Sequence, residues 1–301
     1  MIVKRGFEEL DLWTYPDIRS CYLFIPSVLA SNSPKVLKLG ECSVLAHHLN
    51  TTGMAFMSLR KLTLDTIKLG GKLLDNIISA CPLLEELALI RCYRLSNIQV
   101  NSLHVLKRFN VIGPWKELEA IEINSPSLVY FHYDDEYAPC IDLSMCQNLK
   151  HLSKWNSTIE VASFNELISK IPSLEVLYII RCDMLETLQI SSPRLKRYTL
   201  YDCRRLTWFD LDAPNLNMFL YKGNLVLKSQ SAVYTAKRLC KELLVYQKDG
   251  LDCCDSWRVK CWGHYLKAAT VESYEELEDE RLIAFFDAAA RTLSGNQKKK
   301  F

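Results

Sequence analysis

The sequence predicts an α/β solenoid, in which successive short repeats each add one parallel strand to a common sheet. The first observation is a recurring phrase of the form L-x-x-L-x-L or L-x-x-L-x-I, with Leu62, Leu87 and Leu177 as its middle residues. The second is a period, because ten copies can be aligned with their middle residues 21 to 27 residues apart. The third is that five of the ten prolines lie five residues before such a middle residue. Proline there ends the preceding element before the next strand begins.

The middle residues serve as markers of the repeats: Leu10, Leu37, Leu62, Leu87, Phe109, Phe131, Leu152, Leu177, Tyr198 and Phe219. Apolar residues alternate around each marker, which is typical of a strand with one buried face. One such strand cannot bury that face alone, whereas stacked neighbours can. A period in the low twenties with this alternation is the signature of a leucine-rich repeat. We therefore predict a leucine-rich-repeat solenoid with a parallel β-sheet on its concave face and mixed helices and strands on its convex face.

The segments between markers differ in length and predict two kinds of return element. A second apolar alternation predicts short strands within 95–100, 118–123, 141–143, 185–190 and 206–211. The longer repeats hold enough residues for helices over 72–81 and 164–170, each closed by a proline. The copy at Leu152 is degenerate because its next inward position is Lys154, which leaves the direction of Trp155 open.

The period stops near residue 223, and the composition of the chain then changes. We predict two domains, a solenoid of about ten repeats over 1–223 and a small α+β region over 224–301. Within the second domain the pattern predicts a helix over 232–246, a strand over 267–273 and a helix over 282–291. A cysteine- and tryptophan-rich stretch spans 253–266.

Composition limits the possible functions. The 301 residues are 49% hydrophobic, enough for a sizeable core, and the net charge of +2 gives no broad reason to bind nucleic acid. No run of about 18 apolar residues predicts a membrane span, and the charged amino end lacks a signal-peptide core. We expect a cytoplasmic or nuclear protein with neither nucleic acid nor membrane as a partner.

The sequence also predicts a protein that is not an enzyme and that has no cofactor. It contains no complete phosphate loop, no H-E-x-x-H and no G-x-S-x-G. Four of the twelve cysteines lie five residues after a marker, where a side chain satisfies backbone groups of the turn, and we expect them as structural thiols: Cys42, Cys92, Cys182 and Cys203. A further cluster, Cys253, Cys254, Cys261 and His264, lacks the paired C-x-x-C spacing of structural zinc sites, so no metal is predicted.

Three motifs resemble plant F-box/LRR-repeat proteins of the FBD type. They are the Ser-Pro-x-Leu phrases at 125–128 and 192–195, the Cys-Pro-x-Leu-Glu-x-Leu phrase at 81–87, and Cys-Trp-Gly-His-Tyr-Leu-Lys at 261–267 with the acidic and then helical segment after it. The resemblance covers nearly the whole chain. It implies that the repeats select substrates for an SCF-type E3 ubiquitin ligase and that residues 224–301 form an FBD-like region.

One feature of that family has no counterpart in this sequence. Its members begin with an F-box, whose helices dock the ligase adaptor, and nothing before Phe7 could supply one. We therefore expect a truncated chain that lacks the F-box and does not bind the adaptor by itself. The alternative is a stand-alone leucine-rich-repeat scaffold or competitor that binds a protein without any role in ubiquitin transfer.

The outward residues of the predicted strands indicate where a protein ligand would bind on the concave face. From the fifth marker onward they gather aromatic and basic side chains, which commonly anchor protein interfaces. The candidate partner-binding residues are Arg108, Tyr130, His132, His151, Trp155, Tyr178, Arg197 and Tyr201. The alternative is that these aromatic rings pack sideways as cross-strand pairs within the sheet.

Overall fold

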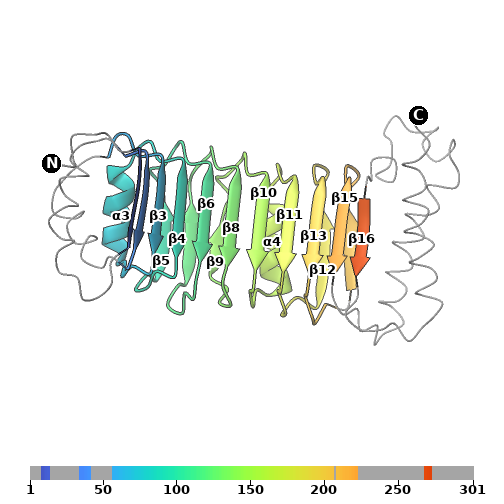
Figure 1. The fold of residues 1–301 in the computed structure, drawn as a ribbon. Helices are drawn as coiled ribbons and strands as arrows, with labels where there is room; N and C mark the ends of the chain where they lie inside the picture. Colours follow the sequence, from blue (N-terminus) through green and yellow to red (C-terminus); the bar gives the residue numbers. More distant parts are fainter. Residues whose placement is uncertain (1–7, 14–33, 42–55, 207, 223–267, 273–301) are drawn as a thin grey trace, which may run out of the picture. The chain divides into compact units, whose positions relative to one another are not determined.

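The computed structural model describes residues 8–13, 34–41, 56–206, 208–222 and 268–272. The chain divides into two compact units, Met1–Lys150 and His151–Phe301. Each unit is built in the same way, from a main parallel sheet and a second layer of short strands and one helix (Figure 1).

The main sheet of the first unit contains six strands in chain order, with the strands of the second layer between them in the sequence. They are β1 (Glu9–Trp13), β2 (Val36–Gly40), β3 (Lys61–Asp65), β4 (Glu86–Ile90), β6 (Arg108–Ile112) and β8 (Tyr130–Asp134). Neighbouring strands are parallel and pair marker to marker, as Leu62 does with Leu87. The six predicted strands of this unit are confirmed, with every marker at the second position of its strand.

The main sheet of the second unit follows the same rule. Its strands are β10 (His151–Trp155), β11 (Val176–Ile180), β13 (Arg197–Tyr201), β15 (Met218–Lys222) and β16 (Ala268–Glu272). The pairs are again parallel and aligned by their markers. The four remaining marker strands are therefore confirmed, and so is the strand predicted within 267–273, which pairs with β15 as a further parallel strand.

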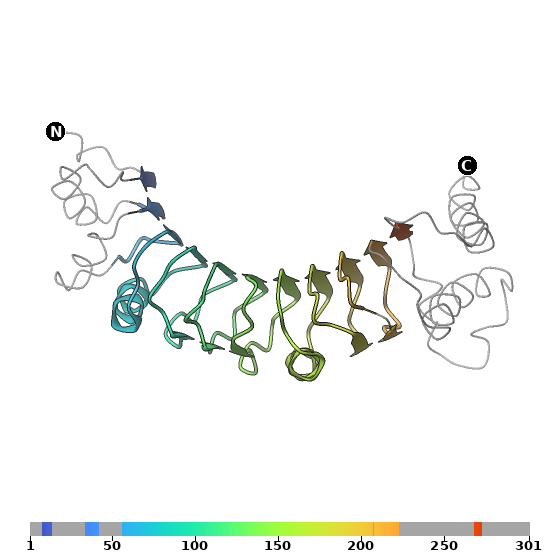
Figure 2. The same cartoon turned by 90° about the horizontal axis from the view of Figure 1, so that it is seen from below.

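The second layer lies on one side of the main strands in each unit (Figure 2). In the first unit it consists of α3 (Gly71–Ala80) and the parallel strands β5 (Asn97–Val100), β7 (Ala120–Ile123) and β9 (Cys140–Asp142). In the second unit it consists of α4 (Val161–Ser169), β12 (Thr187–Ser191) and β14 (Trp208–Asp212). All five predicted return strands and both predicted helices are confirmed, although α4 begins three residues before the predicted start at 164.

The core fills the space between the two layers. In the main strands from β2 to β13, each marker and the residue two positions later are buried, as in β4, where Leu87 is 1% exposed and Leu89 is 0% exposed. Buried side chains from the second layer, such as Ile98 and Ile121, complete the core from the other side. The alternation of leucine along each strand is therefore the direct cause of the two-layer packing.

The chain leaves most main strands through one residue in the left-handed region, with φ between 48° and 56°. These residues are Glu41, Thr66, Arg91, Asn156, Arg181 and Asp202. The N–H of Thr66 donates to the carbonyl of Ile90 at the end of the next strand (2.8 Å), and the N–H of Arg181 donates to Tyr201 in the same way (2.8 Å). This repeated bond aligns the ends of adjacent strands.

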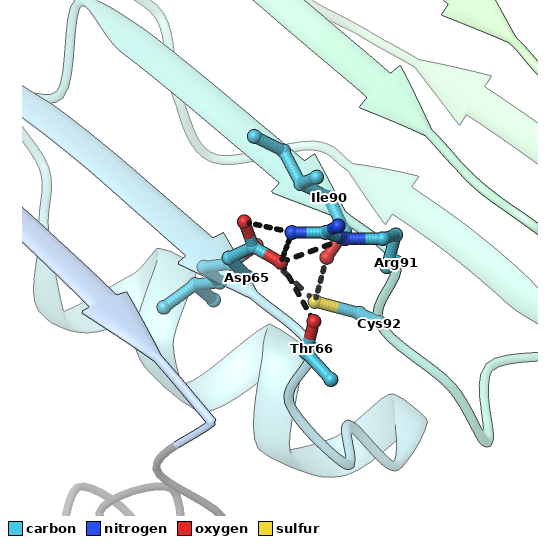
Figure 3. A network of polar contacts seen from close by, with 6 residues as sticks. Asp65, Thr66, Ile90, Arg91 and Cys92 are labelled. Atoms are coloured by element: carbon cyan, nitrogen blue, oxygen red, sulfur yellow. Dashed lines mark hydrogen bonds and ion pairs between the residues drawn. The ribbon is translucent and has the colours of Figure 1, made fainter. Parts of the chain in front are cut away.

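Thiols occupy the turn after this residue. The thiol of Cys92 donates to the carbonyl oxygens of Leu64 (3.3 Å) and Ile90 (3.5 Å), as Figure 3 shows in part. Cys182 and Cys203 lie at the same position of later repeats, and each thiol donates to a strand-end carbonyl. The structural role predicted for these three cysteines is confirmed, and Cys42 lies outside the described residues.

Several expectations concern residues that the structure does not describe. The helices predicted over 232–246 and 282–291, and the cluster Cys253, Cys254, Cys261 and His264, lie outside the described ranges. The domain boundary predicted between residues 223 and 224 stays a prediction, as does the FBD-like character of residues 224–301.

Candidate functional site

The first, third and fifth residues of each main strand point away from the second layer. We call the surface they form the open face of each unit. Burial follows this alternation, as in β6, where Arg108 is exposed, Phe109 is buried and Asn110 is half-buried. All eight candidate residues occupy open-face positions: Arg108, Tyr130 and His132 in the first unit, and His151, Trp155, Tyr178, Arg197 and Tyr201 in the second.

In the first unit, Arg108 and Tyr130 form a pair. They face each other in the register of β6 and β8, and the guanidinium carbon of Arg108 lies 4.4 Å from the centroid of the Tyr130 ring. This distance is typical of a cation–π interaction. His132 lies two residues further along β8 and is only 7% exposed, so it offers a partner little surface.

Other charges on the open face of the first unit are paired with one another. Lys61 bonds to Glu86 at 3.0 Å, and Lys38 bonds to Glu9 at 2.9 Å, each across adjacent strands. At the end of β3, the carboxylate of Asp65 accepts two hydrogen bonds of 2.8 Å from the Arg91 guanidinium (Figure 3). The Asp65–Arg91 pair has no signal in the sequence, because its partners are 26 residues apart and meet only through the strand register.

In the second unit, aromatic and aliphatic side chains gather on the open face. Trp155, Ile180 and Tyr201 align across β10, β11 and β13 in the register of the sheet. Tyr178 lies between Ser153 and Thr199 in the adjacent row. We call these four half-buried residues, Trp155, Tyr178, Ile180 and Tyr201, the aromatic patch. They place four large apolar or aromatic side chains on three adjacent strands.

The structure also settles the degenerate repeat at Leu152. Lys154 is 0% exposed and occupies the inward position of β10, so the strand keeps the register of its neighbours. Trp155 therefore lies on the open face. Ile180, which completes the row between Trp155 and Tyr201, was not among the candidates, although an apolar residue at an outward position is a signal that could have identified it.

The row at the start of these strands contains His151, Val176, Arg197 and Met218. Arg197 is exposed, and Met218 is 42% exposed, which is high for a large apolar side chain. The aromatic patch is thus bordered by a cation and by further apolar surface.

The described part of the chain contains neither a cluster of metal ligands nor a disulfide bond. No group of three or more His, Cys, Asp or Glu side chains there could hold a metal ion, and the six described cysteines are all free thiols. Burial raises the pKa of Cys81 and of Cys92 to about 12. Among the described helices, none has the length and apolar character that crossing a membrane requires.

Comparison with known proteins agrees with this architecture. The model of the At1g61320/AtMIF1 LRR domain family matches residues 1–141 and 136–284. The chain is 24% identical over 297 residues to the F-box/LRR-repeat protein At3g59210 of Arabidopsis thaliana, covering 86% of this chain and 58% of that protein. It is 30% identical over 142 residues to the F-box/LRR-repeat protein At3g58900 of the same plant, covering 46% and 42%.

The chain therefore spans about half the length of these curated relatives. The two matches of the family model together cover most of the chain, in both described units. On these grounds the chain belongs to the At1g61320/AtMIF1 leucine-rich-repeat domain family and resembles plant F-box/LRR-repeat proteins.

Proposed function

We propose that this chain is a protein-recognition module that binds its partner through the open face of its repeats, with the aromatic patch at the centre of the contact. The observation that carries the proposal is that Trp155, Tyr178, Ile180 and Tyr201 form apolar surface that the described residues leave half-exposed. Aromatic side chains bury much area on binding at a low cost in conformational entropy, which is why they commonly dominate interfaces.

The finer proposal is that the partner is a substrate of an SCF-type E3 ubiquitin ligase, with this domain as its recognition part. It is supported by the resemblance of the motifs and by the term F-box in the names of both relatives. The alternative is a stand-alone repeat scaffold or competitor. In neither case does the domain act as an enzyme.

The central experiment compares two double variants of the 301-residue protein as baits in an affinity purification from an Arabidopsis extract. Tyr178→Ala with Tyr201→Ala removes two rings from the aromatic patch. Lys38→Ala with Thr63→Ala removes two open-face side chains from the first unit and serves as the control. Partners are identified by mass spectrometry, and their affinities are then measured with purified proteins.

We expect the tyrosine pair to weaken partner binding more than about tenfold, because anchor truncations commonly cost about 2 kcal/mol or more each. The control pair should leave affinity within about twofold. Thermal melts of all three proteins should show that both double variants remain folded. Equal weakening by the two pairs, or unfolding of the tyrosine pair, would show that the rings serve packing rather than recognition.

The ubiquitination and stability of the partner distinguish a ligase substrate from the partner of a stand-alone scaffold. A ligase substrate carries ubiquitin and accumulates when this protein is depleted or when the proteasome is inhibited. A partner of a scaffold shows neither response. The measurement is the ubiquitin content and half-life of the purified partner in plant cells, with and without the protein.

A further inference from the structure

Arg197 stands out among the charged residues of the open face because it has no counter-charge among the described residues. It is exposed at the start of β13, and its side chain makes no ion pair or hydrogen bond with any residue that the structure describes. Its neighbours in the register are Val176 and Met218, both apolar. The guanidinium is thus held at the border of an apolar surface.

The acidic residues nearest in sequence are already engaged. Glu175, in the turn before β11, accepts a bond of 2.8 Å from Lys196. Asp202, just after β13, lies 3.7 Å from Arg181 and 3.4 Å from Arg204. No open-face position of β10, β11 or β13 holds an aspartate or a glutamate.

The first unit differs in this respect. There the open-face lysines Lys38 and Lys61 are paired with glutamates, and Arg108 is stacked on the Tyr130 ring. The repeats of that unit therefore neutralise these open-face cations across adjacent strands. Among the open-face lysines and arginines whose side chains the structure describes, Arg197 is the exception, and it lies next to the aromatic patch.

We propose that the segment bound by the aromatic patch is an apolar peptide stretch that carries a carboxylate, and that this carboxylate pairs with Arg197. The proposal rests on the function proposed above and names the chemistry of its partner. A guanidinium recognises a carboxylate through two parallel N–H···O bonds. Apolar surface around it excludes water on binding, which strengthens such a pair and penalises a partner that leaves the cation unpaired.

The geometry sets the spacing expected in the partner. Arg197 precedes Tyr201 by four residues on one strand, which corresponds to about 13 Å at about 3.3 Å per residue. Trp155 and Tyr201 are two strand spacings apart, or about 10 Å. An extended segment that reaches both features therefore places its acidic residue about four residues from its apolar anchors.

The test uses a phage-displayed library of random peptides about 12 residues long, selected on the full 301-residue protein. Selected peptides are synthesised, and their affinities are measured by fluorescence anisotropy. We expect aspartate or glutamate at about four residues from leucine, isoleucine or an aromatic residue. Arg197→Gln should weaken these peptides about tenfold or more, whereas Lys196→Gln removes the same charge at the adjacent, Glu175-bound position and should leave affinity unchanged.

A charge exchange gives an independent result. Arg197→Glu should reject the acidic peptides and bind the same peptides with lysine in place of the acid, which a general loss of folding cannot produce. If peptides bind in a Tyr178-dependent manner but lack acidic residues and ignore Arg197→Gln, the proposed carboxylate chemistry is wrong while the recognition function stands. If no selected peptide depends on Tyr178 or Tyr201, both proposals fail.

Discussion

At the scale of single residues, Lys154 is the most unusual feature of the second unit. It occupies the inward position of β10, opposite Ile179 in the register, where other repeats place leucine, valine, isoleucine or tyrosine. The hydrogen bond from Cys203 and, to a smaller extent, the nearby Lys154 ammonium lower the pKa of the Cys182 thiol. The core of this repeat therefore contains a small polar group of one lysine and two thiols within an apolar surround.

This arrangement predicts that Lys154→Met stabilises the protein. Burying an ammonium costs several kcal/mol in desolvation, and an apolar side chain at this position removes that cost. Methionine has a similar length and adapts to irregular space. We expect a gain of about 1–2 kcal/mol in the free energy of unfolding, measured by chemical denaturation.

The matched control for that variant is Lys170→Met. Lys170 is exposed at the end of α4 and pairs with Glu166 across one helical turn at 2.8 Å. Its loss should cost no more than about 0.5 kcal/mol. A Lys154→Met protein that loses more than about 1 kcal/mol would show that the lysine contributes stabilising interactions in the core that outweigh its desolvation.

At the scale of elements, the Ser-Pro phrases explain how one repeat is joined to the next. The hydroxyl of Ser125 is fully buried and donates to the carbonyl of Leu103, one repeat earlier, at 2.8 Å. Asn148 and Asn215 then donate from the following repeat to the carbonyls of Pro126 and Pro193, at 2.8 Å and 2.6 Å. Serine and proline thus perform separate tasks, because the hydroxyl satisfies a buried carbonyl while proline ends the preceding strand.

We predict that Ser125→Ala destabilises the protein by about 1–3 kcal/mol, because the buried carbonyl of Leu103 loses its donor and cannot reach water. Ser127→Ala is the control. Ser127 also donates to a carbonyl of the previous repeat, that of His104 at 2.6 Å, but in an exposed environment where water replaces the lost bond. Its substitution should change stability by about 0.5 kcal/mol or less. Equal effects of the two substitutions in denaturant titrations would contradict this account.

The elements themselves could largely be read from the sequence, and the reason is physical. Period-two burial fixes both the face and the register of each strand, so one marker per repeat was enough to align the main sheets. The start of α4 was missed because Val161, Ala162 and Ser163 carry no distinctive signal, and the residue before them, Glu160, makes no side-chain cap. Helix ends without a cap are set by packing against the rest of the fold.

At the scale of the whole chain, the sequence predicts which residues lie in the rows of the open face. It does not predict how buried their side chains are or what they contact. Register alone placed seven of the eight candidate residues on the open face, and it left the direction of Trp155 open until the structure showed Lys154 at the inward position. The burial of His132, the stacking of Arg108 on Tyr130 and the apolar neighbours of Arg197 depend on side chains from repeats more than 20 residues away. A single sequence does not specify those neighbours.

The repeats also make the stability of the chain approximately a sum of local terms, because each repeat contacts mainly its neighbours. Buried thiols report on the opening of these repeats. Cys81, Cys92 and Cys146 are each at most 1% exposed, whereas Cys140 is exposed. Burial raises the pKa of Cys146 to about 11 and that of Cys81 and Cys92 to about 12. Burial therefore keeps solvent away from these three thiols and disfavours their ionisation.

We therefore predict that iodoacetamide at about pH 8 labels Cys140 in the native protein and leaves Cys81, Cys92 and Cys146 unlabelled. With a pKa of about 12, about one thiol in ten thousand is ionised at that pH, and the thiolate is the reactive form. Labelling of the three buried thiols should begin at the denaturant concentration at which the first unit unfolds, because only then does burial end. Peptide-resolved mass spectrometry separates each site, and Cys140→Ser confirms its assignment. If Cys92 reacted as fast as Cys140 without denaturant, the turn after β4 would be open to solvent, and the hydrogen bonds of its thiol could not hold adjacent repeats together.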